Sequence, residues 1–310
     1  MTTAGRRLRV PGMGILASRS RTPQPGRERS GLRGLRGLLG LLPFGAYTAI
    51  FLGVPTVAVI VGAFQTPHGG LTLKNVTVAV HSPYSNGFVE SIELALVTSI
   101  VPGILGVFIA YAVHTSRGSF LKRVVSTASG VFANFGGVQL AFLFVASLSA
   151  TGVVTVWLQD LGIALTTRWL FTFKGVALVY MYFQLPLMVL IVTPALNGLK
   201  PAWREASENL GAKGWQYWRY VGGPVLAPTV LGCTLLLFGF GLSAYATARA
   251  LTAGTIPLTP MQIGNVMNGN VIAGEQNVGM ALGLGLIVIL VVVLVFYTVL
   301  QRRASRWLSR

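Results

Sequence analysis

The sequence predicts an all-α membrane protein that crosses the bilayer six times. Three observations support this fold class. The mean hydropathy is +0.68, hydrophobic residues make up 53% of the 310 residues while charged residues make up 10%, and long apolar runs recur from Leu38 to the end. A bilayer core about 30 Å thick needs roughly 20 helical residues, and open strands are excluded because their backbone groups find no water in lipid.

The first segment, residues 1–37, is expected to form a disordered, basic, cytoplasmic tail. It holds nine arginines and one acidic residue, Glu28, among scattered Pro, Gly and Ser, and this mixture is too polar to bury a core. Arg6 and Arg7 resemble a twin-arginine signal, but the apolar run that follows comes too late and is too long for one. The Arg-rich, acid-poor composition also leaves a transit peptide open.

Residues 38–310 are predicted to form one domain with six spans. Length and hydropathy place these spans at 38–63, 88–113, 124–149, 175–197, 224–248 and 279–300. The third begins with ASGVFANFGG. Its Asn134 and glycine pair are costly against lipid but tolerable against another helix or water.

Lys and Arg are distributed very unevenly between the two sides of this six-span arrangement. Twenty of the 24 fall on one side, in the tail, the loop HTSRGSFLKR, the segment 200–219 and the C-terminal QRRASRWLSR. The other side holds four, Lys74, Arg168, Lys174 and Arg249. Because positive residues concentrate in cytoplasmic loops, we expect both termini and the loop 201–224 to be cytoplasmic.

That cytoplasmic loop contains the polar stretch EASENLGAKGWQYWRYVGGP, which runs from Glu205 to Pro224 between two apolar runs. Pro201 can open a short helix, with Glu205 in an early turn where the helix dipole favours an acid. Gly211 is expected to end this helix, and a second, aromatic one begins near Trp215. The alternative is an interfacial hairpin whose Trp and Tyr rings anchor in lipid headgroups.

The order of residues in this loop resembles the signature of importer-type ABC transporter permeases, which is Glu-Ala-Ala, three residues, Gly, nine residues, Ile, one residue, Leu-Pro. The matching positions here are Glu205, Ala206, Ser207, Gly211, Val221, Gly223 and Pro224. Ser207 and Gly223 depart from the signature, and Gly223 is expected to loosen the join to the fifth span. ESIELALVTSIVPGILGVFIAYAV and LSAYATARALTAG are also similar to the family, so the resemblance covers about residues 88–300.

The resemblance implies a MetI-like permease subunit of an ATP-driven ABC importer in a bacterial inner membrane. LSAYATARALTAG is similar to permeases for spermidine, putrescine and related solutes such as aminophosphonates. The implied partners are ABC ATPase subunits, a second permease that is this chain or a similar one, and an extracytoplasmic solute-binding protein. ATP belongs to the partner, and no cofactor is expected here. In the loop, the resemblance implies that Glu205 pairs with the ATPase, Gly211 makes the turn and the aromatic residues pack against the spans.

Polar residues inside spans are expensive and are therefore candidates for a solute pathway. The candidates are Asn134, Gln139, Gln184, Ser243, Tyr245 and Thr247. Each has a structural alternative, since such side chains commonly bond between helices. The last three crowd the outer end of the fifth span, but their spacing of two residues lets at most two line one pore.

Several other functions find no support in the residues. The sequence contains no G-x-x-x-x-G-K-[ST] and no Gly-x-Ser-x-Gly, so neither a P-loop nor a hydrolase elbow is expected. The three histidines are too far apart for a metal site, and the basic residues are not grouped on a polar domain that would bind nucleic acid. Two alternatives stay open. One is an ion-coupled secondary transporter, for which inverted repeats and charged residues within the spans are expected. The other is a membrane scaffold.

Overall fold

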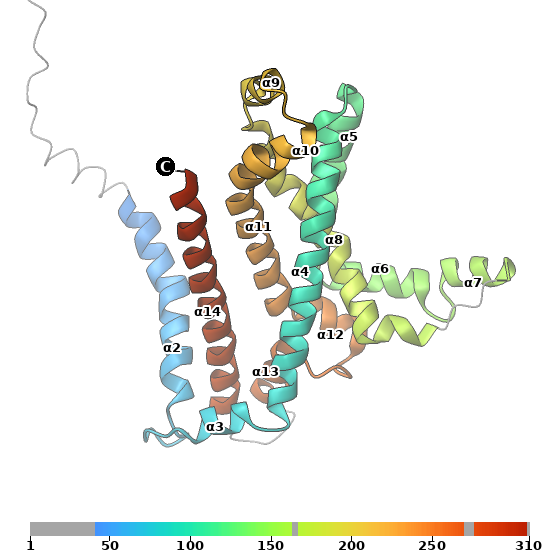
Figure 1. The fold of residues 1–310 in the computed structure, drawn as a ribbon. Helices are drawn as coiled ribbons and strands as arrows, with labels where there is room; N and C mark the ends of the chain where they lie inside the picture. The colour runs from blue at the N-terminus through green and yellow to red at the C-terminus, as the bar shows by residue number, and fades with distance from the viewer. Residues whose placement is uncertain (1–40, 163–166, 270–275, 309–310) are drawn as a thin grey trace, which may run out of the picture. The chain divides into compact units, whose positions relative to one another are not determined.

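The computed structural model describes residues 41–162, 167–269 and 276–308. In these ranges the chain is helical and has no strand; the single β contact is an isolated bridge between Gln65 and Leu71. The all-α prediction is confirmed (Figure 1). The predicted tail, 1–37, lies outside the described residues. The chain divides into two units, Met1–Pro55 and Thr56–Arg310, which are described separately.

The described part of the first unit is a single apolar helix. It is helical from residue 41 and passes through a π-helical turn, η1 (Ala49–Gly53), into α2 (Val54–Ala63), where the unit boundary falls. The rings of Tyr47 and Phe51 lie 4.7 Å apart, centroid to centroid. Leu41–Ala63 is long and apolar enough to cross a membrane, as the sequence predicted for 38–63.

The second unit is a bundle in which successive long helices run in alternating directions (Figure 1). Its long helices are α4 (Tyr84–Thr115), α5 (Ser119–Ala133), α8 (Phe173–Asn197), α11 (Gly223–Ser243) and α14 (Gln276–Leu308). Helix α8 is central, because it packs against α4, α5 and α11 and is the most buried of the six candidate spans.

Small residues let these helices approach closely. A Cβ on Gly106 of α4 would lie 2.7 Å from the Cβ of Met188 in α8, and a Cβ on Gly241 of α11 would lie 2.8 Å from Thr98 Oγ1 in α4. Both distances are shorter than real Cβ contacts, so only glycine fits. Packing through glycine is the usual way in which membrane helices associate when there is no water to drive them together.

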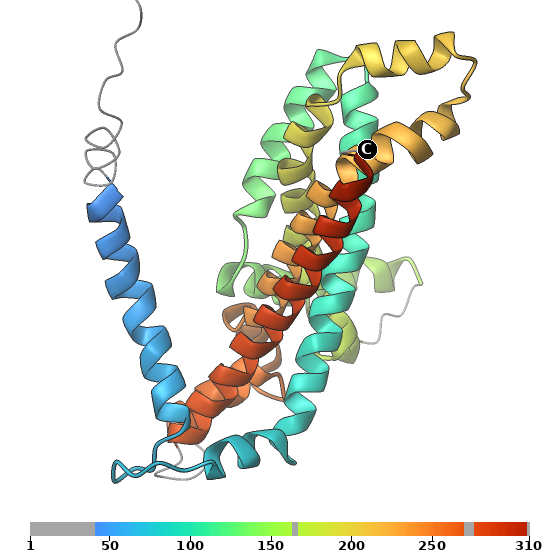
Figure 2. The same ribbon diagram turned by 60° about the vertical axis from the view of Figure 1, so that its left-hand side comes forward.

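Short helices lie at the two ends of the bundle. Figures 1 and 2 show α9 (Pro201–Asn209) and α10 (Gly214–Tyr217) at the end where α4 turns into α5, with α3 (Lys74–Val80) and α13 (Thr259–Met267) at the opposite end. Between α10 and α11 lies a π-helical turn, η3 (Trp218–Gly222). The basic segments 117–123 and 200–219 therefore share one end, and Lys74 lies at the other.

The third predicted span, 124–149, is wrong in its boundaries. The structure breaks this segment at Asn134–Gly137, and α6 (Val138–Leu148) leaves the line of α5 in both views (Figures 1 and 2). Helix α5 ends at Ala133, and Gly137, whose φ of +80° favours glycine, turns the chain into α6. The third candidate span is instead Val138–Asp160, formed by α6 and α7 (Val153–Asp160).

The fifth predicted span, 224–248, is displaced toward the N-terminus. The helical run extends from Gly214 to Ser243, and the chain then turns at Ala244 into α12 (Ala246–Thr252). Tyr245 and Thr247 therefore lie beyond the span, in contrast to the prediction. The other spans agree within a few residues, except that α14 continues past residue 300 to Leu308.

Candidate functional site

Helix α9 is the most exposed polar element of the bundle. Pro201 is its first residue, as predicted, and Lys200 before it is extended. A first-turn proline suits this position because the missing N–H would have no partner there anyway. None of its nine residues is buried, and Figure 2 shows it lying across one end of the bundle.

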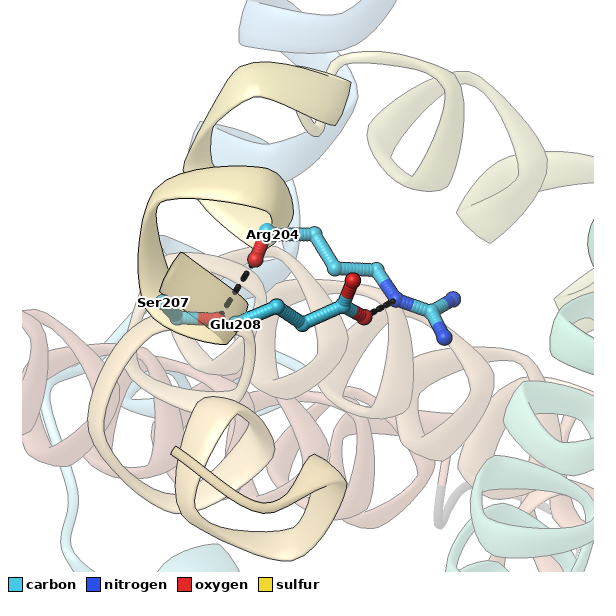
Figure 3. A network of polar contacts seen from close by, with 3 residues as sticks. All are labelled: Arg204, Ser207 and Glu208. Atoms are coloured by element: carbon cyan, nitrogen blue, oxygen red, sulfur yellow. Dashed lines mark hydrogen bonds and ion pairs between the residues drawn. The ribbon is translucent and has the colours of Figure 1, made fainter. Parts of the chain in front are cut away.

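The charged side chains of α9 are not all equivalent. Arg204 Nε donates to Glu208 Oε1 at 2.9 Å, and Ser207 Oγ donates to the carbonyl of Arg204 at 2.7 Å (Figure 3). The hydrogen bond to Glu208 raises the pKa of Arg204. Glu205 is exposed and has no hydrogen bond or ion pair with any residue that the structure describes. It is therefore the carboxylate of α9 that is available to a partner.

Gly211 fixes the direction in which the chain leaves α9. Its φ is +77°, the amide of Gly211 donates to the carbonyl of Glu208 at 2.9 Å, and the amide of Ala212 donates to the carbonyl of Ser207 at 3.0 Å. These two bonds form a Schellman motif, in which the left-handed residue is nearly always glycine. The prediction that Gly211 ends the helix is confirmed.

The aromatic half of the segment packs only in part against the spans. Tyr217 is buried, and the ring of Trp218 meets Tyr111 of α4 edge to face at a centroid distance of 4.9 Å. Trp215 and Tyr220 are 60% and 68% exposed. Two of the four rings therefore hold the segment to the bundle, and two face outward.

Gly223 makes the join to α11 tight, where the sequence suggested that it would loosen it. A Cβ at this position would overlap the carbonyl oxygen of Trp218, five residues earlier, because the π-helical turn brings that carbonyl unusually close. A Cβ on Gly222 would lie 2.9 Å from the ring of Trp218. Glycine in place of the signature leucine is thus required by the backbone path. Pro224 follows in the first turn of α11, as predicted.

The loop signature converges on an apolar groove between α9 and the start of α11. Ala206, Ser207 and Val221 line it. The groove measures about 310 Å³, and its remaining walls are Trp203, Leu210 and Val225. Residues 15 positions apart in the sequence are thus brought to one surface, while Glu205 lies outside the groove.

The six candidate pathway residues differ in their surroundings. Gln184 and Thr247 are buried, and the other four, Asn134, Gln139, Ser243 and Tyr245, are exposed. Asn134 and Ser243 bond to carbonyls of their own helices, at Gly130 and Gly239. Gln184 Nε2 lies 3.4 Å from the carbonyl of Leu237 in α11, and its Oε1 has no partner.

Two polar contacts near these candidates were not predicted from the sequence. The hydroxyl of Tyr180, in the N-terminal third of α8, donates to the carbonyl of Ala244 at 2.6 Å and so holds the α11–α12 turn. Arg249 Nη1 donates to Asn265 Oδ1 at 3.1 Å and links α12 to α13. Neither pair has a sequence signal, because the partners are 64 and 16 residues apart. Among the described residues, no three His, Cys, Asp or Glu side chains gather at a possible metal site.

Comparison with known proteins identifies one family model and several transport permeases that are similar to this chain. The family model described as binding-protein-dependent transport system inner membrane component matches residues 103–307. The trehalose transport permease SugB of Mycobacterium tuberculosis is 27% identical over 71% of this chain and 73% of its own length. The sulfate permease CysT of Escherichia coli is 30% identical over 52% of this chain but only 56% of its own length.

Two further similarities cover more of the chain. The spermidine/putrescine permease PotB of Haemophilus influenzae is 23% identical over 86% of this chain and 92% of its own length. The crystal structure of a bacterial ABC transporter that imports the acidic polysaccharide alginate aligns over 88% of this chain and 96% of that chain, with a TM-score of 0.70 at 18% identity. At this identity the likeness confirms the fold.

Proposed function

Because the chain belongs to the family of binding-protein-dependent transport system inner membrane components, and is thus a multi-pass permease subunit of an ABC importer, we propose that its segment 201–224 couples it to a separate ATPase subunit. ATP is hydrolysed on that partner, and the segment carries the movement to the spans. The residues that act are Glu205, Ala206, Ser207, Gly211, Val221 and Pro224.

The observation that carries this proposal is the exposure of α9 together with the constrained backbone at Gly211 and Gly223, which connects it to α11. No residue of α9 is buried, and the Glu205 carboxylate has no hydrogen bond or ion pair among the described residues, so both can be reached by a partner. The Schellman turn at Gly211 and the glycine-tight join at Gly223 leave the segment little freedom to bend. A push on α9 would therefore reach α11 as a rigid-body movement.

The positive charges of the bundle indicate which of its ends faces the cytoplasm. The basic segments 117–123 and 200–219 lie together at the α9 end, which supports a cytoplasmic location for that end. The arginines of both terminal segments and the number of spans would make both termini cytoplasmic as well. The α3 and α13 end would then face an external solute-binding protein. A second permease subunit, identical or similar, would complete the pathway.

For the solute we propose a small organic cation of the polyamine class, with a related compound such as an aminophosphonate as the alternative. The similarity to PotB extends over most of both chains, although relatives for trehalose and sulfate match as well. Glu90 and Glu93, in the second and third turns of α4, place carboxylates near the proposed outer mouth. Of the six pathway candidates, Gln184 has the strongest support, because its buried Oε1 lacks a partner.

Charge-matched substitutions in α9 test the coupling. Glu205→Gln and Asn209→Lys each raise the net charge of the same helix by one at an exposed position, the first by removing a negative charge and the second by adding a positive one. In a strain lacking the chain, Glu205→Gln is expected to reduce solute uptake strongly and Glu205→Lys to abolish it, while Asn209→Lys restores uptake. Membrane abundance, measured by immunoblot, should be equal. Normal uptake with Glu205→Lys would refute the role of this carboxylate.

Uptake of labelled solutes tests the substrate class separately. Deleting the chain should abolish uptake of radiolabelled spermidine or putrescine, and excess unlabelled polyamine should compete where trehalose and sulfate do not. Loss of trehalose or sulfate uptake instead would reject the polyamine class and leave the coupling proposal intact.

A further inference from the structure

Three cavities follow one another along α4, from the base of α9 into the level of the spans, and neighbouring cavities share lining residues. The first, about 280 Å³, lies between the ends of α4 and α8 and the α9–α10 segment. The second, about 220 Å³, shares Tyr111, Leu196 and Trp218 with the first. The third, about 430 Å³, lies between α4 and α11 and shares Val107 and Phe108 with the second.

The cavity nearest α9 is cationic. Lys200 and Arg204 line it, together with His114, and no acidic residue does. Glu208 bonds to Arg204 through Nε alone, so the two terminal amino groups of the guanidinium have no partner among the described residues. Lys200 contributes an ammonium group to the same lining, and this group lies 5.9 Å from the centroid of the Trp203 ring. A guanidinium fork and an ammonium group that line one cavity can together bind the oxygens of a phosphate.

The cavity between α4 and α11 is apolar and open to the surroundings of the bundle. Its walls include Ile100, Ile104 and Phe108 of α4, which are 47%, 54% and 66% exposed, and Leu231 of α11, which is 42% exposed. From Ile100 to Tyr111 the line extends over eleven residues of helix, or about 16 Å at 1.5 Å per residue. Half of a hydrocarbon core about 30 Å thick has the same depth.

We propose that this line of cavities binds one anionic phospholipid. Its phosphate lies between Lys200 and Arg204, and one acyl chain runs down the groove between α4 and α11. The occupant follows from the order of the surfaces, since a cationic pocket that continues into an apolar groove one leaflet deep matches a charged headgroup followed by its chain. A neutral lipid would bring no negative charge to pair with Lys200 and Arg204, and a soluble phosphate would not fill the apolar groove.

The bound lipid would support the segment that leads from α9 to α11. Trp218 lines both the cationic cavity and the one below it, so a lipid there would fill the space on which this ring rests. The site does not depend on the proposed function, because its lining belongs to this chain alone.

Two charge-matched double variants test the headgroup. Lys200→Gln with Arg204→Gln removes both cations of the cavity, whereas Lys213→Gln with Arg219→Gln removes two exposed cations of the same segment that do not line it. Lipid retention by the full chain would be measured by native mass spectrometry with phosphatidylglycerol and phosphatidylcholine. The first pair is expected to weaken phosphatidylglycerol binding about 30-fold, at about 5-fold per cation near the membrane surface. The second should leave it unchanged. Equal loss in both would show only general surface charge and would overturn the proposal.

Two tryptophan substitutions test the acyl chain. Leu231→Trp fills the groove, and Leu236→Trp places the same ring at a 45% exposed position of α11 outside it. We expect the first to reduce phosphatidylglycerol retention and the second to leave it unchanged. Ile104→Trp on the facing wall repeats the test if the first variant folds poorly, as judged by its elution volume.

Other occupants give different results. Displacement of the lipid by inorganic phosphate or glycerophosphoglycerol would show a site for a headgroup alone and would overturn the proposal. In a second test, one copy carries Ile104→Cys and another copy carries Leu231→Cys. Efficient disulfide formation between the two copies would show that a second protein subunit fills the groove, and would also overturn the lipid proposal.

Discussion

Replacing Gly211 by alanine tests whether the direction of α9 matters for coupling. The φ of Gly211 is +77°, and no atom lies within 4 Å of where a Cβ would be. The substitution therefore creates no clash, and its whole effect is the cost of a left-handed backbone for an L-residue, about 1–2 kcal/mol. That cost corresponds to a factor of about 5–30 in the population of the native turn.

Gly214→Ala is the matched control. Its Cβ would also meet nothing within 4 Å, but Gly214 opens α10 with an ordinary backbone conformation. Alanine there is expected to be neutral or slightly stabilising, by up to about 1 kcal/mol. Gly211→Asn should fall between, because asparagine tolerates the left-handed region better than alanine does.

The assay is binding of the ATPase subunit to the full chain in nanodiscs, together with uptake in cells. Gly211→Ala is expected to weaken ATPase binding by up to about 30-fold, since only the native turn presents α9 correctly. Equal binding and uptake by Gly211→Ala and Gly214→Ala would refute the reasoning, because the turn would then not limit coupling.

Two stability predictions follow from the packing. Gly223→Ala is expected to destabilise the chain by about 1–3 kcal/mol, because its Cβ would overlap the carbonyl of Trp218; Gly130→Ala, at an open helical position, is the control, and equal thermal midpoints in detergent would contradict the prediction. Tyr180→Phe should cost about 1 kcal/mol by removing the hydroxyl that holds the turn after α11. Tyr182→Phe, whose ring packs without a hydroxyl bond in the described structure, should cost less, and the opposite order would show that the Tyr180 bond is not stabilising.

The number of spans and the layout of the loop could be predicted because both depend on local sequence. An apolar run of about 20 residues needs no tertiary information to be recognised as a span. Pro201 and Gly211 likewise mark the start and end of α9 through their own backbone preferences.

The predicted boundaries of the third and fifth spans and the predicted role of Gly223 were wrong, because the backbone path at these places is not evident from hydropathy or residue spacing. Hydropathy alone predicts that the span continues through Asn134 and the glycine pair, whereas α5 ends at Ala133 and Gly137, with its positive φ, turns the chain into α6. Ser243 ends α11 because Tyr180, from another helix, bonds the next carbonyl. The role of Gly223 depends on a π-helical turn, which residue spacing does not indicate.

Site-specific cross-linking tests the central claim most directly. Glu205→Cys is introduced after the single native cysteine, Cys233, is replaced by alanine. Leu71→Cys, at an 87% exposed position at the opposite end of the bundle, is the control. We predict that a thiol-reactive cross-linker joins position 205, and not position 71, to the ATPase subunit in native membranes. Cross-linking from position 71 alone, or from neither position, would contradict the assignment of α9 as the coupling helix.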